Sequence, residues 1–465
     1  MKNQSSSFVY QSEYPCSAED LYTYHSRDGA LERLLPPWEK NTLISKQGNI
    51  RPGSQVKLKM YAGPFPFYFH ARHVEDKPGK MFKDIQEKGP FSSWTHSHFF
   101  HNTKKGSLLE DRIEYALPAH RFLPSFVKNH VEKKLTGGFR HRQRTLTADI
   151  ALHQQCSQIP LRILITGASG VLGRRLIPLL RTGGHTVYTL VRRRPYANRN
   201  EIFWDPETGF LSKTDLPELD GVIHLAGAPI GLKRWTVESK QRVLESRVKG
   251  TELLTRTLAT LSKPPKVLLS ASAVGYYGDC QDRLIDETEP AGKDFISTVC
   301  HQWEEAAQPA RQAGIRTVFF RMGVSMTPRG GALKRILSTS PLGFIRYFGS
   351  GKQYISWISD DDLISAMLHA LTCSSLEGPV NVAAPEPVTN RELMRVLAKI
   401  TDRPLLFPLS ARLFQGMYGQ MAREIILSGC SVSSKKLQDS GFHFRHPNLE
   451  TTLRNLLGID TQEKI

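Results

Sequence analysis

From about residue 161 onward, short apolar runs rich in β-branched residues alternate with longer stretches of helical periodicity. Five of these runs read LRILITG, HTVYTLV, GVIHLAG, KVLLSAS and RTVFFRMG. Short apolar runs bounded by turn residues are typical of strands buried on both faces. Strands that alternate with helices favour a parallel sheet covered on both sides. The pattern therefore predicts an α/β fold with a doubly wound, Rossmann-type sheet.

The first 155 or so residues show a different pattern, in which segments of strand character are separated by Gly/Pro turns. These segments are SQVKLKMYAG, PFPFYFHARHVED, KMFKDIQEKG, SWTHSHFF and LLEDRIEYAL. Their spacing is that of β-hairpins. A helical stretch is predicted to follow from about 121 to 152, with an interruption at Gly137 and Gly138. The last segment, from 389 on, predicts mostly helices.

The length of 465 residues predicts at least two domains, because single cores stop growing near ~250–300 residues. The changes of pattern delimit three segments, 1–155, 161–388 and 389–465. No apolar run of about 18 residues and no export signal stands out, and the six cysteines are scattered without a CxxC pair. These observations predict a cytoplasmic protein with reduced thiols and no structural zinc site.

The formal net charge of +18 raises the question of a polyanionic partner. The excess of Lys and Arg is spread along the chain, and no known base-reading motif is present. A spread excess favours general solubility over a nucleic-acid patch, which would need a clustered basic face and a salt-sensitive affinity. We therefore expect no nucleic-acid partner.

The stretch LRILITGASGVLGRRL places three glycines directly after a predicted strand and before a predicted helix. This is the context that the dinucleotide fingerprint requires. Gly167 permits the tight turn, Gly170 lets the backbone approach a pyrophosphate, and Gly173 allows the helix to pack closely with its N-terminus toward the negative charge. The loop predicts nucleotide binding, and the alternative is a purely structural turn.

Arg192, Arg193 and Arg194 follow the second predicted strand of the α/β segment. About twenty residues after the last glycine, proteins that prefer NAD place an acid against the ribose hydroxyl. An acid would repel a 2′-phosphate, whereas guanidinium groups pair with phosphate through two hydrogen bonds. The arginines therefore favour NADP, with a solvated basic turn as the alternative.

The motifs TGASGVLG, GVIHLAGAPI and SASAVGYYGD resemble those of extended and atypical short-chain dehydrogenase/reductases. FWDPETG, RWTVESKQRVLESRVKGT, FGSGKQYISWISDDD and GPVNVAAPEPVTN narrow the resemblance to YfcH-like epimerase family proteins, over nearly all of 161–458. The resemblance implies an NADP-binding Rossmann domain followed by a small carboxy-terminal helical subdomain. Together with the glycine loop and the arginines, it predicts cofactor contacts at Thr166, Gly167, Ser169, Gly170, Val171, Leu172, Gly173, Arg192, Arg193, His224, Leu225, Ala226, Gly227 and Arg247.

The stretches LERLLPPWEKNTLI and WTHSHFF, with a Gly-Pro hairpin between them, resemble a START-like (SRPBCC) domain fused ahead of such a reductase domain. This resemblance implies an α+β helix-grip fold around an apolar cavity, and hence a hydrophobic ligand. His96 and His98 lie two apart on a predicted strand and therefore share a face. A third metal ligand is not evident, so no metal site is predicted, and a polar pocket lining is the simpler interpretation.

The catalytic residues of the wider superfamily are only partly matched. There a Tyr moves a proton at the substrate oxygen, a Lys four residues later lowers the pKa of that Tyr, and a Ser or Thr polarises the oxygen. When Glu304 is taken as the acid that often follows the Lys, Ile296 and Cys300 occupy the Tyr and Lys positions. Cys300 has no evident His/Asp relay, so a buried thiol is favoured over a nucleophile.

The hydroxyl groups that remain near the expected site are those of Ser272, Tyr276 and Tyr277. By position in SASAVGYYG, the resemblance gives Ser272 the polarising role, and a hydroxyl that caps a turn is the alternative. Tyr276 and Tyr277 are the nearest candidate proton donors, since a donor need not be ionised. The alternative for both is packing against the cofactor ring.

Two further charged groups carry open alternatives. Arg247 occupies the place where related reductases carry an Asn that steadies an active-site water. It is expected either to bind an anionic group or, together with Lys249, to lie on a solvated helix face. Asp360, Asp361 and Asp362 predict a helix start with acids at its positive end rather than a magnesium site.

Two functions from different classes fit the sequence. The first is an NADP-dependent oxidoreductase or epimerase-like enzyme acting on a small or apolar carbonyl or alcohol substrate. The second is a non-catalytic NADP(H)-dependent sensor or carrier of a hydrophobic ligand, which the loss of the Tyr and Lys favours. A hydroxyl on the substrate side of the nicotinamide distinguishes them.

Overall fold

The computed structural model describes residues 5–118, 124–156, 159–196, 199–231, 233–338 and 343–459. The chain divides into an amino-terminal unit, Met1–Gln155 with Pro178–Gly184, and a carboxy-terminal unit, Cys156–Ile177 with His185–Ile465. Among the helices in the described ranges, none is long and apolar enough to span a lipid bilayer.

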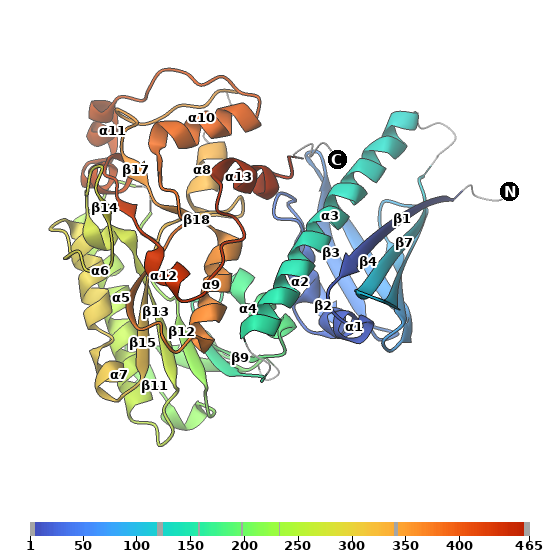
Figure 1. The fold of residues 1–465 in the computed structure, drawn as a ribbon, viewed down its shortest axis with the longest axis horizontal. Helices are drawn as coiled ribbons and strands as arrows, with labels where there is room; N and C mark the ends of the chain where they lie inside the picture. Colours follow the sequence, from blue (N-terminus) through green and yellow to red (C-terminus); the bar gives the residue numbers. More distant parts are fainter. Residues whose placement is uncertain are drawn as a thin grey trace. The chain divides into compact units, whose positions relative to one another are not determined.

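The amino-terminal unit is built on a seven-stranded antiparallel sheet with the order β1-β7-β6-β5-β4-β3-β2 (Figure 1). The hairpin spacing predicts β3 to β7, but it does not predict the two edge strands β1 and β2. The strands are β1 (Ser6–Tyr14), β2 (Thr42–Gln47), β3 (Gln55–Ala62), β4 (Phe65–Lys77), β5 (Met81–Lys88), β6 (Ser93–Thr103) and β7 (Gly106–Ala116). Two short helices, α1 (Ala18–Ser26) and α2 (Ala30–Leu34), separate β1 from β2.

One long helix, α3 (Ser125–Cys156), packs against a face of this sheet and completes a helix-grip arrangement (Figure 1). The expected interruption at Gly137 and Gly138 is wrong, because α3 continues through both glycines. Each glycine costs ~1 kcal/mol in a helix, whereas burying Phe139 and Leu146 against the sheet contributes ~1.5–3 kcal/mol each. The predicted first residues of this helix, 121–123, lie outside the described residues.

The carboxy-terminal unit contains an eight-stranded sheet with the order β11-β10-β9-β8-β12-β13-β15-β19. All neighbouring pairs are parallel except β10 and β11. The strands are β8 (Arg162–Thr166), β9 (Thr186–Val191), β10 (Glu201–Asp205), β11 (Phe210–Leu211), β12 (Gly221–His224), β13 (Val267–Ala273), β15 (Arg316–Met322) and β19 (Gly378–Val382). All five apolar runs that predict strands form strands of this sheet, and the doubly wound topology is confirmed.

Helices cover both faces of the parallel sheet. One layer holds α5 (Val237–Ala259), α6 (Phe295–Glu305) and α7 (Gln308–Gln312), which contact one another through α5. The other layer holds α4 (Gly173–Thr182) and α9 (Asp360–Thr372). The strand order reverses between β8 and β12, and ligands of such sheets bind beyond the carboxyl ends of the strands at this point.

The last part of the chain is mostly helical, as the sequence predicts, and packs with segments that precede it. Its core joins α8 to α10 and α13 through buried side chains such as Leu333, Leu397 and Leu453. Two short strand pairs, β14–β21 and β17–β20, fasten it to the rest of the unit. The elements are β14 (Leu284–Ile285), β16 (Val324–Met326), α8 (Gly331–Ser338), β17 (Tyr354–Ile355), β18 (Trp357–Ser359), β20 (Val388–Thr389), α10 (Asn390–Ile400), α11 (Ala411–Tyr418), η4 (Ala422–Leu427), β21 (Ser431–Val432), α12 (Lys435–Asp439) and α13 (Leu449–Leu457).

Candidate functional site

The glycine loop connects β8 to α4 and has no room for side chains at two of its three glycines. Gly167 has a φ of 71°, and a Cβ on it would lie 2.8 Å from the backbone of Leu225. A Cβ on Gly173 would lie 2.5 Å from the carbonyl oxygen of Gly167. Gly170 is exposed, and a Cβ there would approach only the Gly167 carbonyl oxygen, at 3.1 Å. The loop therefore presents bare backbone at the mouth of α4, as a pyrophosphate cradle requires.

The other residues predicted in this loop surround that backbone. Ser169 and Val171 are exposed, and Leu172 is half-buried. The carbonyl oxygen of Ser169 accepts a hydrogen bond from Arg174. Val171 lies against Gly330, since a Cβ on that glycine would be 2.6 Å from the valine side chain. The segment that precedes α8 thus borders the loop.

Thr166 and His224 end β8 and β12, and their side chains bond to each other rather than outward. Thr166 Oγ1 accepts hydrogen bonds from the backbone N–H groups of Leu225 and Ala226, so its own proton goes to His224 Nδ1, 2.8 Å away. His224 Nε2 then donates to Thr251 on α5. Burial lowers the pKa of His224 to about 4, so the ring is neutral. The network fixes the backbone of the 225–227 loop.

The end of β9 carries the arginines that favour NADP, and they are not equivalent. Arg193 makes a two-pronged ion pair with Glu201 at 2.7 and 2.8 Å, and its guanidinium lies over the ring of Tyr196. Arg192 and Arg194 are exposed. The charge of Arg193 is thus balanced by Glu201.

Arg247 is buried beneath the 225–228 loop, so the expectation of a solvated helix face is wrong for this residue. Its Nη1 donates to the carbonyl oxygens of Ala228 and Val243, and its guanidinium lies over the ring of Trp303. A Cβ on Gly227 would meet the Arg247 guanidinium at 3.2 Å. Lys249 is solvated and pairs with Glu245. Arg247 therefore supports the loop from inside.

Ser272 and Tyr277 belong to a buried network at the carboxyl ends of β13, β15 and β19. Ser272 Oγ donates to Glu304 Oε1 at 2.7 Å, and Arg321 donates to both oxygens of that carboxylate at 2.9 Å. Arg321 also donates to the Tyr277 hydroxyl, which donates to Asn381 Oδ1 at 2.7 Å. Burial raises the pKa of Tyr277, and the ion pair with Glu304 overcomes the opposing effect of burial and raises that of Arg321. The network is an ion pair capped by neutral hydroxyls.

Tyr276 differs from its neighbour because it is half-buried, and no hydrogen-bond partner for its hydroxyl is found among the described residues. Its ring lies on the Arg321 guanidinium, with the central carbon 3.4 Å from the ring centroid. The ring is thus held in place while the hydroxyl stays available. Of the three predicted catalytic residues, only Tyr276 has this combination.

Ile296 and Cys300 are both buried on α6. A Cβ on Gly275 would lie 2.5 Å from Ile296 Cγ2, so Ile296 supports the loop that carries Tyr276. Burial raises the pKa of the Cys300 thiol to about 12, which keeps it protonated. Burial therefore disfavours a nucleophilic thiolate at this position, and α6 packs through both side chains.

Asp360, Asp361 and Asp362 begin α9, as predicted, with Ser359 as the N-cap. Arg175 on α4 pairs with Asp361 at 2.7 Å and with Asp360 at 3.3 Å. The Asp362 carboxylate accepts two backbone N–H groups from residues 445–446, and burial raises its pKa to about 6. These acids join α4 to α9 and the carboxy-terminal segment.

The sequence reasoning missed Arg321 and Asn381, which complete the buried network. One signal was present, because Arg321 stands inside the apolar run RTVFFRMG, where a charge needs a buried partner. The partner, Glu304, lies 17 residues away in the chain and meets it only through the fold.

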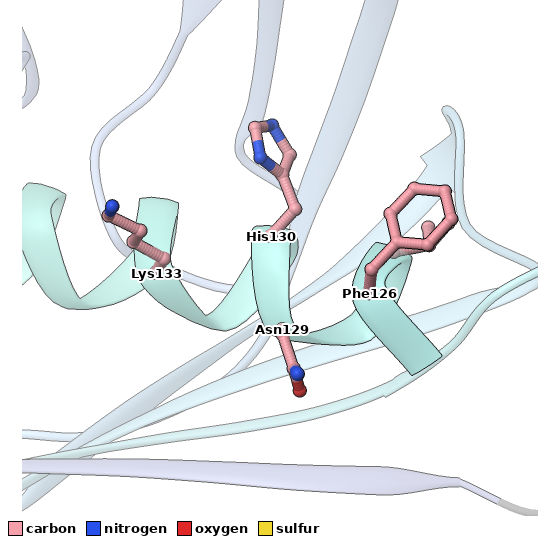
Figure 2. Close-up of a pocket in the computed structure, with 5 residues that line it drawn as sticks. Phe126, Asn129, His130 and Lys133 are labelled. Carbon is pink, nitrogen blue, oxygen red and sulfur yellow. The ribbon is translucent and has the colours of Figure 1, made fainter. Parts of the chain in front are cut away.

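A surface hollow lies along the first turns of α3, lined by Phe126, Val127, Asn129, His130 and Lys133 (Figure 2). All its lining residues come from one helix. Figure 2 shows Asn129 and His130 pointing in opposite directions. Since the side chains do not converge, the hollow has no place in the candidate site.

Three family models match the chain. Residues 163–383 match the NAD dependent epimerase/dehydratase family, 411–456 match a domain of unknown function (DUF1731), and 14–143 match the polyketide cyclase/dehydrase and lipid transport family. The first match covers the glycine loop and the buried network. The third supports the START-like interpretation of the antiparallel sheet and α3.

Two solved structures are informative relatives. The nucleoside-diphosphate sugar epimerase of Corynebacterium glutamicum aligns with 98% of this chain and 91% of its own, at 29% identity and a TM-score of 0.81. Human epimerase family protein SDR39U1, solved with NADPH, aligns with 64% of this chain and 99% of its own, at 30% identity and a TM-score of 0.59. The structure of human SDR39U1 therefore contains a bound nicotinamide nucleotide, NADPH.

Curated relatives agree with these structures. An epimerase family protein of Mycobacterium bovis is 38% identical over 299 residues, which are 64% of this chain and 97% of that protein. Human SDR39U1 is 32% identical over 300 residues, which are 64% of this chain and all of that protein. Given near-complete coverage of these relatives and a parallel sheet with a glycine cradle at its switch point, the chain belongs to the epimerase family, within the NAD(P)-binding short-chain dehydrogenase/reductases.

Proposed function

We propose that the chain binds NADP(H) and uses it for redox chemistry at a carbonyl or alcohol carbon of a small or apolar substrate. The glycine cradle carries the proposal. Gly167 and Gly173 leave no space for a Cβ, and the exposed Gly170 leaves the backbone open to a pyrophosphate beside the switch point. The packing of the chain itself accounts for Gly167 and Gly173, and the exposed Gly170 is the glycine that a purely structural turn needs least.

The preference for NADP(H) rests on the end of β9. Arg192 and Arg194 are exposed there, and Glu201, an acid that would repel a 2′-phosphate, is neutralised by Arg193. The NADPH in the structure of human SDR39U1 supports the same preference.

Tyr276 is the proposed proton donor. When bound, the nicotinamide supplies or accepts a hydride at the substrate carbon. Tyr276 would give its hydroxyl proton to the substrate oxygen during reduction and take it back during oxidation. The Arg321 guanidinium packs on the Tyr276 ring. Ser272 would help to position Arg321 through the hydrogen bonds that both make with Glu304. This assigns Ser272 and Tyr277 to positioning.

A second candidate is a non-catalytic NADP(H)-dependent sensor or ligand carrier. The observation in its favour is that Ile296 and Cys300 are buried where the wider superfamily has its Tyr and Lys. In this case cofactor binding would persist, and Tyr276 would serve only to pack against the ligand.

The test begins with titration of the purified full chain with NADPH and NADH, followed by assays of NADPH oxidation against apolar aldehydes, ketones and quinones. Turnover that falls about 10²–10⁴-fold in Tyr276→Phe, with NADPH affinity unchanged, would support the enzyme. Tight NADPH binding without turnover of any carbonyl would favour the sensor. Failure to bind either nucleotide would overturn both.

A further inference from the structure

The inward face of the amino-terminal sheet carries a row of buried polar side chains across four adjacent strands. His73 on β4 is opposite Asp84 on β5, Asp84 is opposite His96 on β6, and His98 on β6 is opposite Asp111 on β7. Each is 4–9% exposed. Imidazoles and carboxylates concentrated in a domain interior need a compensating interaction, because burying them is costly.

Three of these residues converge on one point. His96 Nδ1 lies 3.8 Å from Asp84 Oδ2, and His98 Nε2 lies 3.7 Å from the same oxygen. One possible ligand atom from each of the three residues lies within 4.8 Å of those of the other two. Metal bonds of about 2.0–2.2 Å to nitrogen and oxygen place the ligands of one ion roughly 3–4 Å apart. The separations of both histidines from Asp84 fall within this range.

The ring nitrogens that face away from this point meet a second carboxylate. Asp111 Oδ1 lies 3.1 Å from His96 Nε2, in a hydrogen bond, and 2.6 Å from His98 Nδ1. Histidines that bind metals commonly donate their other N–H to a carboxylate, which fixes the tautomer and increases the basicity of the ligand nitrogen. Asp111 accepts such a hydrogen bond from His96 and lies within ion-pair distance of His98.

Aromatic rings hold the two imidazoles in their orientation. Phe82 stacks on His98 with a centroid distance of 4.0 Å, and Phe139 of α3 meets His96 edge-on at 5.7 Å. The imidazole centroids themselves are 3.9 Å apart, a separation at which two positive rings would repel each other. An imidazole binds a metal in its neutral form, so metal binding by both rings is compatible with this short separation.

We propose that Asp84, His96 and His98 bind one divalent transition-metal ion, with Asp111 as the carboxylate that orients both histidines. Two imidazoles and one carboxylate are ligands for Zn²⁺ or Fe²⁺, whereas Mg²⁺ and Ca²⁺ prefer oxygen alone. The third ligand is invisible in the sequence motif WTHSHFF because Asp84 lies on the neighbouring strand. The proposal is independent of nucleotide binding, which concerns the other unit.

The competing explanation is a metal-free hydrogen-bond network of the same four residues. Titration of the chelator-treated full chain with Co²⁺ distinguishes them, because Co²⁺ in a site of nitrogen and oxygen ligands gives absorption bands in the visible range. We expect one equivalent to bind with such bands and Zn²⁺ to displace it. An absence of stoichiometric binding of both ions would overturn the proposal.

Variants locate the ion. Asp84→Ala and His98→Ala are expected to abolish the bands, whereas His101→Ala, an exposed histidine of the same strand, is expected to keep them. Asp111→Asn is expected to retain one equivalent with about 10–100-fold weaker affinity. Circular dichroism checks that each variant is folded. Equal Co²⁺ affinity in folded Asp111→Asn and wild type, or bands that survive Asp84→Ala, would overturn the assignment.

Discussion

The hydroxyl of Ser272 points at the carboxylate of Glu304, 2.7 Å away, in a place that solvent does not reach. The same carboxylate receives two hydrogen bonds from Arg321, so its charge is balanced inside the unit. The proton of this hydroxyl is thus donated to Glu304, and the Ser272 side chain is fully buried. The rings of Tyr276 and Tyr277 in turn contact Arg321.

Glu304→Gln is expected to destabilise the carboxy-terminal unit by about 3–5 kcal/mol. The variant leaves the Arg321 guanidinium buried without its counter-charge, and a buried ion pair that loses one partner is penalised on this scale. Urea denaturation of the full chain measures the change in the free energy of unfolding. Asp439→Asn breaks an exposed pair with Lys435 and should cost less than about 1 kcal/mol. Similar losses in both variants would contradict the argument.

Gly173→Ala is expected to reduce NADPH affinity by at least about tenfold. The new Cβ would lie 2.5 Å from the Gly167 carbonyl oxygen and 2.7 Å from Ala168 Cα, so the loop must move. Isothermal titration measures the affinity. Gly416→Ala is the matched control, because a Cβ there meets no atom within 4 Å. Unchanged NADPH affinity in Gly173→Ala would show that the loop is not the cradle.

The fold could be predicted from the sequence wherever burial on both faces makes a strand continuously apolar. The central strands β8, β12 and β13 are predicted by this signal. The edge strand β1 was not predicted, because only one of its faces is buried and its partner, β7, is about a hundred residues away in the chain. The continuity of α3 was not predicted, because tertiary packing outweighs the low helix propensity of Gly137 and Gly138.

The residues of the candidate site likewise fall into those that local sequence predicts and those that only the fold brings together. Local motifs predict the glycine loop and the Arg192–Arg194 turn, since each acts through consecutive residues. The pairing of Glu304 with Arg321 and the convergence of Asp84 on His96 depend on contacts across strands and helices. The sequence contains one sign of the buried polar cluster. Asp111 takes a position that alternates with Leu109 and Ile113, which places a carboxylate on the buried face of β7.

Arg192→Ala is expected to weaken NADPH binding by about tenfold without changing NADH binding. Arg192 is exposed at the turn that would face a 2′-phosphate, which only NADPH carries. Parallel fluorescence titrations with the two nucleotides measure the ratio. In Arg193→Ala the freed Glu201 should also disfavour NADPH, but Glu201→Gln in that background should restore it. If Arg192→Ala lowers the affinity for NADPH and NADH equally, Arg192 does not bind the 2′-phosphate.

Cys300 is expected to resist alkylation in the folded protein at pH 8. Burial raises its pKa to about 12, so less than about one thiol in a thousand is ionised, and the side chain is 4% exposed. Cys373, which is half-exposed, should react first. Mass spectrometry after brief treatment with iodoacetamide, with and without urea, locates the modified thiols. Rapid modification of Cys300 without urea would contradict the buried position of α6.

His224→Asn is expected to change how the stability of the carboxy-terminal unit depends on pH. Burial holds the folded pKa of His224 at about 4, below the unfolded value of about 6.5, so unfolding takes up a proton between these values. The stabilisation from the neutral ring is therefore complete above about pH 6.5 and is lost as the pH falls toward 4. The free-energy difference between wild type and His224→Asn should shrink by about 2–3 kcal/mol from pH 7.5 to pH 4.5. Hydrogen exchange in peptides of β12 and α5 reports on this unit alone.

His301→Asn, on the exposed face of α6, should change stability by less than about 0.5 kcal/mol at either pH. A difference that does not change with pH would mean that His224 keeps its ordinary pKa and that burial does not hold the ring neutral.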